Sequence, residues 1–330
     1  MRLDSSRPEQ DSRAEVSAAD PGGLSGDVHQ SAERSFRLPR PLHLELTLRP
    51  LRRGPLDPTL RPAGGAFWRA SRTPAGPGRE RLRQSPDGTV HVQAWGPGAG
   101  WLLEKAPELC GSLDDDSGFE PQHELVRTLH RLAPGLRLAR TLAVWEAAIA
   151  TVLEQRVVGL DAWRSWRLLV RRQSEPAPGP GPPLWLPPAP ERVATLPLHQ
   201  FAGLGVEAKR AATARRAGTA AKRLEEIIEL DPPAARRRLL SVPGLGPWSA
   251  AEISRVALGD PDAVPVGDYH IPHQVAWALA GEPRGSDERM LELLEPFRGQ
   301  RGRVLALLNQ AGVRAPTYGP RQPLRDISKL

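Results

Sequence analysis

Two short stretches in the second half of the chain carry residues whose types and spacing could do chemistry. The first, SVPGLGPWSAAEI from position 241, sets two glycines around a leucine and follows them with a proline and a tryptophan. The second, VGDYHI, carries Asp268. A glycine turn at a helix start can offer backbone amides to an anion such as a phosphate oxygen. An aspartate at a helix start can hold an ionised carboxylate, because amide donors and the helix dipole both favour the anion.

The glycine turn predicts a helix, a tight turn and a second helix. Pro243 cannot continue a helix, and Gly244 and Gly246 permit backbone angles that residues with a Cβ resist. Pro247 is favoured in the first turn of the following helix. The amides of Gly244, Leu245 and Gly246 could then point outward together at the helix start. A turn whose glycines serve packing alone is the alternative that this stretch by itself leaves open.

Asp268 follows an extended loop and predicts the start of another helix. We expect it to be the N-cap residue, with Pro272 in the first turn, where its missing N–H costs no helical hydrogen bond. A capping role alone would explain this aspartate. A catalytic role is compatible with capping, because both need the ionised carboxylate.

The elements that must position these stretches are helices, and a small sheet precedes them. LHLELTL (42–48) alternates strictly, which predicts a half-buried strand. AFWRASRT (66–73) and TVHVQAW (89–95), the latter after the turn signal PDG, predict two more strands. We expect a small antiparallel sheet that ends near Trp101.

Apolar residues at three- and four-residue spacings after Cys110 predict helices. A proline-rich stretch at 173–190 interrupts them and predicts a loop or linker that crosses the surface. The fold class is therefore α+β, with a small amino-terminal sheet domain and then an all-helical domain. The predicted parts are a disordered tail at 1–36, a β-rich domain at 37–110, a helical domain at 111–314 that contains the hairpin at 239–258, and a carboxyl-terminal tail at 315–330.

Composition limits the function classes. The chain has 330 residues, a net charge of +7 and a pI near 10.3, which suits a polyanionic partner. Its single cysteine, Cys110, excludes an intrachain disulfide and a cysteine-ligated zinc site or iron-sulfur cluster. The first residues lack the apolar core of a secretory signal, and no uncharged apolar run is long enough to span a bilayer. We expect a soluble, cytoplasmic protein.

The glycine turn and the aspartate together resemble the helix-hairpin-helix DNA glycosylases, and the resemblance extends from about Leu38 to Val313. The chain is similar to the 3-methyladenine DNA glycosylase II type, including its actinobacterial members. VPGLGPWSA is similar to the hairpin, VGDYHI to the segment with the catalytic aspartate, and WEAAIATVLEQRV to the helix whose glutamine lines the base pocket. The resemblance implies an enzyme that flips a damaged nucleotide out of double-stranded DNA and cleaves its N-glycosidic bond, with Asp268 stabilising the cationic sugar.

The resemblance also implies roles for other residues. A flipped base stacks on aromatic rings, and related hairpins hold a monovalent cation, sodium or potassium, between main-chain carbonyls and a DNA phosphate. Arg298, Arg301 and Arg303 are candidates for phosphate contacts, with a solvated basic face as the alternative. The implied site residues are Trp248, Gln155, Tyr269 and Phe297 for the base pocket, Gly244, Leu245, Gly246 and Ser249 for DNA binding, and the carbonyls of Leu240, Val242 and Leu245 for the cation.

One departure from the family pattern bears on strand cleavage. Related enzymes that also cut the strand have a lysine two residues after the second hairpin glycine, and this chain has Trp248 there. No lysine lies between Lys222 and Lys329, so we expect no nearby amine to replace it. The sequence therefore predicts a monofunctional glycosylase for alkylated purines such as N3-methyladenine, without lyase activity and without a required cofactor.

Two alternatives stay open. The lesion could instead be a deaminated or oxidised base, since selectivity depends on the shape of the pocket. The chain could also be a non-catalytic helix-hairpin-helix DNA-binding protein, although Asp268 argues against that. In each case we expect a monomer that acts on nucleoid DNA.

Overall fold

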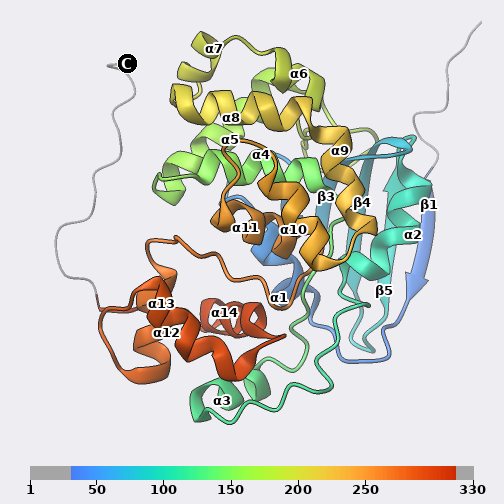
Figure 1. Cartoon of the computed structure of the whole chain (residues 1–330). Helices are drawn as coiled ribbons and strands as arrows, with labels where there is room; N and C mark the ends of the chain where they lie inside the picture. Colours follow the sequence, from blue (N-terminus) through green and yellow to red (C-terminus); the bar gives the residue numbers. More distant parts are fainter. Residues whose placement is uncertain (1–30, 317–330) are drawn as a thin grey trace, which may run out of the picture.

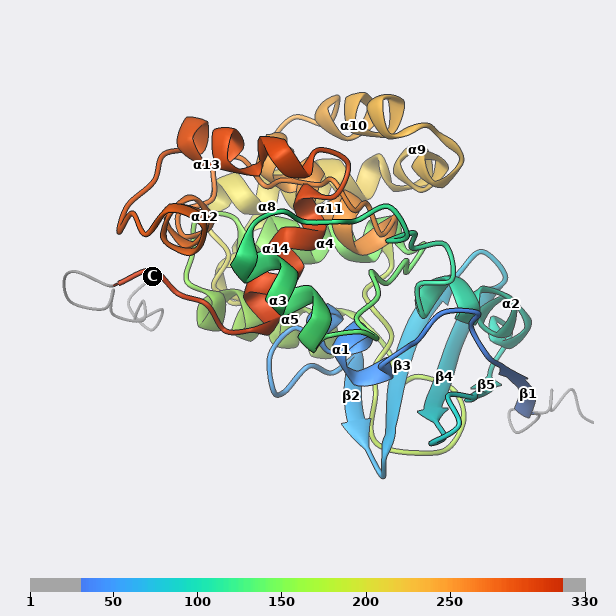
Figure 2. The same ribbon diagram turned by 90° about the horizontal axis from the view of Figure 1, so that it is seen from below.

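The computed structural model describes residues 31–316. A five-stranded antiparallel sheet stands beside two groups of helices (Figure 1 and Figure 2). No helix in this range is long and apolar enough to cross a bilayer. The strands lie in the order β1-β5-β4-β3-β2, and their bounds are β1 Ser31–Phe36, β2 Leu60–Ala63, β3 Ala66–Thr73, β4 Gly76–Gln84 and β5 Val90–Trp95.

The strands predicted at 66–73 and 89–95 are confirmed as β3 and β5, whereas β4 was not predicted. β4 carries Arg79 and Glu80 at buried positions, which breaks the apolar alternation that identifies a strand. Arg79 donates a hydrogen bond to the carbonyl of Gly179 (2.9 Å), and Glu80 pairs with an arginine of β3. These pairings with other segments offset part of the cost of burying the two polar side chains, although Arg79 Nε and Glu80 Oε2 have no hydrogen-bond partner among the described residues.

The strand predicted at 42–48 is wrong. This stretch forms helix α1 (Leu44–Leu48), and the His43 imidazole caps its first turn. The buried residues of α1 are Leu44, Thr47 and Leu48, which have the spacing of one helix face. The alternation in the sequence fits a strand equally well, and packing of this face against the rest of the chain decides for the helix.

Residues 31–36, predicted as part of a disordered tail, form the edge strand β1. Arg34 of this strand donates hydrogen bonds to two backbone carbonyls of α2 (Ala99–Leu109). Trp101 belongs to α2, so the sheet ends at Trp95 rather than near Trp101. The rest of the predicted amino-terminal tail, 1–30, and residues 317–330 of the predicted carboxyl-terminal tail lie outside the described residues.

The helices form two groups, and their order in space differs from their order in the sequence. α3 precedes α4 in the chain but packs with α14 in the smaller group (Figure 1 and Figure 2). α4 lies at the centre of the larger group, with buried residues on nearly every side. The bounds are α3 Glu124–Leu132, α4 Val144–Glu154, α5 Gly159–Gln173, α6 Pro190–Thr195, α7 Leu198–Ala202, α8 Ala208–Thr219, α9 Ala221–Glu225, α10 Pro232–Leu240, α11 Pro247–Ala257, α12 Ile271–Ala280, α13 Asp287–Leu294 and α14 Arg301–Gln310, with 3-10 turns at Arg49–Leu51, Glu226–Glu229 and Glu295–Phe297.

The proline-rich loop predicted at 173–190 packs on the sheet. Leu184 is buried in a small apolar cluster with β3. Gly179 lies so close to Trp95 that a Cβ there would overlap the indole ring. Trp68 and Trp95 stack on each other beside the loop, with ring centroids 5.7 Å apart. This segment is therefore a packed cover of the sheet rather than a free linker.

A buried ionic cluster joins the sheet to α4. Arg69 of β3 donates a hydrogen bond to Glu80 of β4 (2.8 Å), and its guanidinium lies 3.6 Å from Glu146 of α4. Ser71 donates a hydrogen bond to the same Glu146 (2.6 Å). Burial raises the pKa of the Glu80 and Glu146 carboxyls above the ordinary value, while the positive charge of Arg69 lowers it.

Candidate active site

The predicted helix-turn-helix is present. α10 ends at Leu240 and α11 begins at Pro247, with a tight turn between them. Gly244 has a φ of +101°, and a Cβ there would overlap the Thr213 side chain of α8. Backbone conformation and packing both require glycine at this position.

Gly246 is a glycine for a different reason. Its φ of −95° and ψ of −174° suit any residue, and a Cβ there would meet no atom within 4 Å. It is the N-cap residue of α11, and no side chain caps this helix end. The fold therefore leaves open space at Gly246, into which the backbone of a ligand could approach.

The backbone amides of the turn differ in whether they donate a hydrogen bond within the protein. The Leu245 amide donates a hydrogen bond to the Val242 carbonyl (3.0 Å), and the Leu245 side chain is buried. The expectation that three turn amides point outward is therefore wrong for Leu245. None of the hydrogen bonds among residues 31–316 uses the amides of Gly244 and Gly246. Together with the first-turn amides of α11, these two are free to donate hydrogen bonds to an anion.

The Asp268 carboxylate caps α12, although this helix starts later than predicted. α12 begins at Ile271, and His270 occupies the N-cap position. Asp268 Oδ1 accepts hydrogen bonds from the amides of His270 (2.7 Å) and Ile271 (2.9 Å). Asp268 is thus not the N-cap by position, but its side chain folds forward and satisfies the free amides of the helix start.

The second oxygen of this carboxylate contacts the hairpin helix. Trp248 Nε1 donates a hydrogen bond to Asp268 Oδ2 at a distance of 2.9 Å. Three N–H donors therefore fix the orientation of the carboxylate. The sequence predicts Trp248 as a surface on which a base stacks, and the structure adds a direct contact between this indole and the aspartate.

The loop that carries Asp268 is anchored from α13. Both carboxylate oxygens of Asp287 accept the amide of Gly267, at 3.1 and 3.0 Å. His273 Nδ1 accepts the amide of Gly285, which ties α12 to the segment before α13. Sequence reasoning missed Asp287, whose only local signal is its place in the first turn of a helix.

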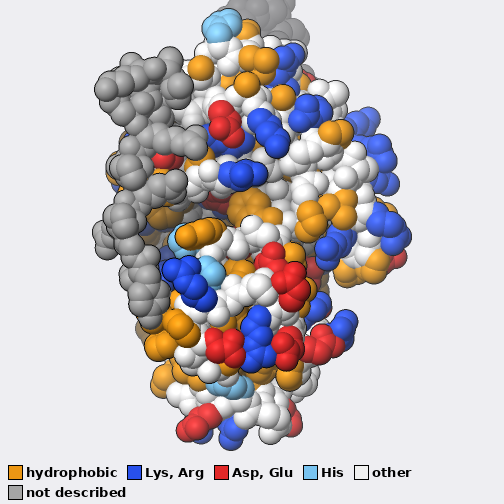
Figure 3. All heavy atoms as spheres, turned by 60° about the vertical axis from the view of Figure 1, so that its left-hand side comes forward, with side chains coloured by type: hydrophobic (Ala, Val, Ile, Leu, Met, Phe, Trp, Pro, Cys, Tyr) orange, Lys and Arg blue, Asp and Glu red, His pale blue; other side chains and the backbone are white. Residues whose placement is uncertain are grey.

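A cleft of about 1270 Å³ opens between the two helical groups at this point. Asp268 and Trp248 line it together with Gln155 and Tyr269, so the predicted catalytic residue and three of the four predicted base-pocket residues meet in one place. Tyr269 is 75 % exposed, and its ring lies edge-on to His270 with centroids 4.9 Å apart. On the face shown in Figure 3, Lys and Arg side chains predominate in the upper part and acidic side chains gather lower down.

Gln155 links the end of α4 to the hairpin. It follows the last residue of this helix, and its Nε2 donates hydrogen bonds to the Gly244 carbonyl and the Ser249 hydroxyl, both at 2.9 Å. Ser249 is only 2 % exposed. The Ser249 hydroxyl is therefore engaged in this internal contact. Only the backbone of Ser249 is available for the predicted role in DNA binding.

Some predicted site residues lie elsewhere. Phe297 is buried in the core of the smaller helical group, where its ring centroid is 6.4 Å from that of Phe119, and it does not line the cleft. Arg303 is buried and pairs with Asp114, and Arg301 is held by a neighbouring carboxylate. The two arginines therefore serve the fold rather than a phosphate, because α14 packs against chain segments far away in the sequence.

One lysine lies nearer to the site than the sequence indicates. Lys209 of α8 lines the cleft, because α8 packs against the hairpin at Gly244. Lys105 and Lys222 do not line it, and Lys329 lies outside the described residues. The position of Lys209 in the sequence did not predict this placement, and the expectation that no amine replaces the hairpin lysine stays a prediction.

Solved structures share this fold. The 3-methyladenine DNA-glycosylase from Archaeoglobus fulgidus has a TM-score of 0.70 at 18% identity, over 83% of this chain and 97% of that one. The 8-oxoguanine glycosylase/lyase from Clostridium acetobutylicum, in complex with double-stranded DNA, has a TM-score of 0.66 at 13% identity, over 87% of this chain and 98% of that one. The chain therefore shares the fold of these two DNA glycosylases.

Sequence similarity agrees with the fold, although no protein-family model matches the chain. A probable bifunctional transcriptional activator/DNA repair enzyme AlkA from Mycobacterium tuberculosis is 31% identical over 218 residues, which cover 62% of this chain and 42% of that protein. A DNA-3-methyladenine glycosylase from Bacillus subtilis is 23% identical over 195 residues, 56% of this chain and 64% of that protein. The chain thus spans less than half the length of the mycobacterial relative. In sequence it is similar to this AlkA-named relative and to the Bacillus glycosylase, and it shares the fold of the solved DNA glycosylases.

Proposed function

We propose that this protein is a monofunctional DNA glycosylase of base excision repair. It flips alkylated purines such as N3-methyladenine out of double-stranded DNA and hydrolyses the N-glycosidic bond, acting as a monomer on nucleoid DNA. The observation that carries this proposal is the Asp268 carboxylate, which three N–H donors hold in the wall of a cleft bordered by the hairpin turn. The names of the mycobacterial and Bacillus relatives agree with this class of reaction.

The geometry suits a reaction in which positive charge develops on a sugar. A carboxylate that is already held in place stabilises this charge without having to reorganise. The open cleft beside Asp268 takes the flipped nucleotide, and flipping costs least where the damaged base stacks or pairs poorly. The free amides at Gly244 and Gly246 bind a phosphate and hold the strand against the hairpin.

Aromatic side chains in the cleft favour an electron-poor alkylated purine. Trp248 is half-buried, so its ring forms part of the cleft wall while its N–H is held by Asp268. Tyr269 stands exposed at the rim. Bases with a deficit of electrons stack well on such rings.

Release of free bases from a panel of lesion-containing duplexes tests the proposed function. We expect release of N3-methyladenine by the purified protein. Release of deaminated or oxidised bases alone would change the lesion class. Duplex binding without release of any base would favour a non-catalytic DNA-binding protein.

We expect no strand cleavage after base release. A lyase needs an amine close to C1′ of the sugar, and Trp248 stands where related bifunctional enzymes have a lysine. The DNA strand should stay intact until hot alkali is added, and borohydride present during turnover should trap no covalent complex. Lys209 lines the cleft, so Lys209→Gln is the control. A complex that forms with the unaltered protein and disappears in this variant would show that Lys209 acts as a lyase amine.

Gly246→Glu should weaken binding of lesion-free duplex DNA by about tenfold or more, because it adds like-charge repulsion and blocks the approach of the DNA backbone. Gly246→Ala is the control for folding, since the fold has space for a Cβ there. Both variants should keep the Tm of the unaltered protein. Fluorescence anisotropy at two salt concentrations measures the affinity, and an unchanged value for Gly246→Glu would mean that the turn is only structural.

We also propose that the hairpin holds a sodium or potassium ion when DNA is bound, and that no other cofactor is required. The Val242 carbonyl accepts one hydrogen bond, from the Leu245 amide, and its second lone pair fits a cation. The carbonyls of Leu240 and Leu245 would complete the protein's share of the ligands. A DNA affinity that stays unchanged when a bulky organic cation replaces sodium and potassium would contradict this site.

A further inference from the structure

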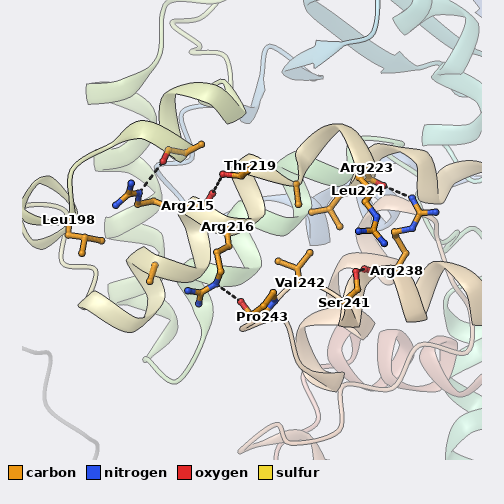
Figure 4. A pocket seen from close by; sticks show the side chains of 13 residues that line it. Leu198, Arg215, Arg216, Thr219, Arg223, Leu224, Arg238, Ser241, Val242 and Pro243 are labelled. Carbon is orange, nitrogen blue, oxygen red and sulfur yellow. Dashed lines mark hydrogen bonds between the residues drawn. The ribbon is translucent and has the colours of Figure 1, made fainter.

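A second hollow, of about 640 Å³, borders the hairpin turn (Figure 4). Ser241, Val242 and Pro243 line this hollow, whereas the next three residues of the turn line the cleft. The turn is therefore the wall between the two. The hollow is also lined by four arginines and by no aspartate or glutamate, and we call it the arginine groove: Arg215, Arg216, Arg223 and Arg238.

Three of these arginines are held in place by backbone carbonyls. Arg216 Nε donates a hydrogen bond to the Pro243 carbonyl of the turn (2.8 Å), and Arg215 Nε donates one to the Ala194 carbonyl (3.0 Å), as Figure 4 shows. Neutral acceptors of this kind orient a guanidinium and leave its charge in place. The third, Arg238, pairs in addition with a carboxylate outside the groove lining.

Arg223 completes the positive surface. Among residues 31–316, its side chain has no hydrogen bond and no ion pair. Leu198 is 45 % exposed and adds apolar surface to the lining, whereas Leu224 and Val242 are buried. The groove thus combines planar cations that match phosphate oxygens with an apolar surface that suits the carbon face of a deoxyribose.

We infer that the arginine groove binds the phosphodiester backbone of the duplex on one side of the lesion. Two observations carry this inference: positive charge without a lining carboxylate, and continuity with the hairpin turn, which borders both the groove and the cleft. The inference rests on the proposed function, because it requires a duplex at the cleft. It adds a DNA contact that neither the hairpin turn nor the cleft supplies.

Thr219 allows a test that leaves every arginine in place. This residue is exposed at the end of α8, lines the groove, and donates its hydroxyl only to the Arg215 carbonyl of its own helix (3.1 Å). Thr219→Glu adds a carboxylate to the groove, and Thr219→Gln is the uncharged control of the same size. We expect Thr219→Glu to bind duplex DNA about fivefold more weakly at low salt. The slope of log affinity against log salt concentration should be shallower by about the contribution of one phosphate contact. Thr219→Gln should bind like the unaltered protein.

A second comparison separates a groove contact from a general effect of charge. Two duplexes are compared. One carries an uncleavable abasic-site analogue near its first end and the other carries it near the opposite end, so each duplex extends far from the analogue on one side only. Thr219→Glu should weaken binding of one duplex and leave the other unchanged, and Arg223→Gln should weaken the same one. Equal affinities of the Glu and Gln variants for both duplexes, or equal losses on both, would overturn the inference.

The control for distant charge is Arg61→Glu on β2, an exposed strand position outside the groove and the cleft. It should bind both duplexes like the unaltered protein. Failure of the unaltered protein to bind any duplex would instead contradict the proposed function, and this inference with it. Base release at saturating DNA should stay near the unaltered rate in the Thr219 variants, because the groove holds no reacting group.

Discussion

Asp268→Asn is expected to lower the rate of base release by at least about 100-fold, while the variant still folds and binds DNA. Under the proposed function, the change removes the negative charge that would stabilise the cationic sugar but keeps the size of the side chain. An amide oxygen can still accept the His270 and Ile271 amides, so the start of α12 keeps its cap. Single-turnover release of N3-methyladenine at saturating DNA measures this effect, and Tm reports the folding.

Asp231→Asn is the matched control. Asp231 caps α10 through a hydrogen bond from the Ala234 amide (2.7 Å), and it does not line the cleft. It should cost at most about 1 kcal/mol of stability and leave base release unchanged. Retention of most activity by Asp268→Asn would remove this aspartate from the mechanism. A loss of stability large enough to explain the lost activity would reduce it to a helix cap.

Arg69→Met should have the largest effect on stability, a loss of about 3–5 kcal/mol in the free energy of unfolding. Arg69 is the partner of two carboxylates at the junction of the sheet and α4, and the Glu80 side chain is only 1 % exposed. Removal of the guanidinium leaves a buried negative charge without compensation. Urea unfolding at neutral pH measures the loss.

The loss should depend on pH. Burial already raises the pKa of Glu80 above its ordinary value of 4.5, and removal of Arg69 raises it further. A carboxyl whose pKa is raised in the folded state costs stability as the pH rises from 4.5 through that pKa. Arg69→Met should therefore lose less at pH 5 than at pH 8, and Glu80→Gln in the same chain should restore part of the loss. A loss that is independent of pH and unaffected by Glu80→Gln would contradict this account.

Local signals in the sequence were sufficient for the hairpin and for two strands. Pro243, the two glycines and Pro247 specify the turn by backbone constraints that act over a few residues. β3 and β5 carry the apolar patterns that predict strands, and both strands pair with β4. Local signals also predicted that the Asp268 carboxylate caps a helix start, although the helix begins at Ile271 and Asp268 is not its N-cap residue.

Contacts between distant segments decided what the sequence could not show. The polar residues of β4 are buried against the proline-rich loop and β3, and no local pattern reports such partners. Lys209 reaches the cleft because α8 packs on the hairpin, and Asp287 reaches Gly267 from the start of α13. The family resemblance assigned Phe297 to the base pocket, but Phe297 is buried in the core of the smaller helical group, where α3 packs with α14.

The proline-rich loop connects the helical part of the chain to the sheet by tight packing. Gly179 and Gly181 lie against Trp95 and Trp68 with no space for a Cβ, so the middle of the helical part is fastened to the sheet well away from the boundary near residue 110. A cut at that boundary would not release two independent halves, since each would expose the surface that the other covers. The sheet lines no part of the cleft. Because the loop packs on both parts, we expect the sheet and the helices to unfold together, so the strands should contribute to the thermal stability of a cleft that they do not line.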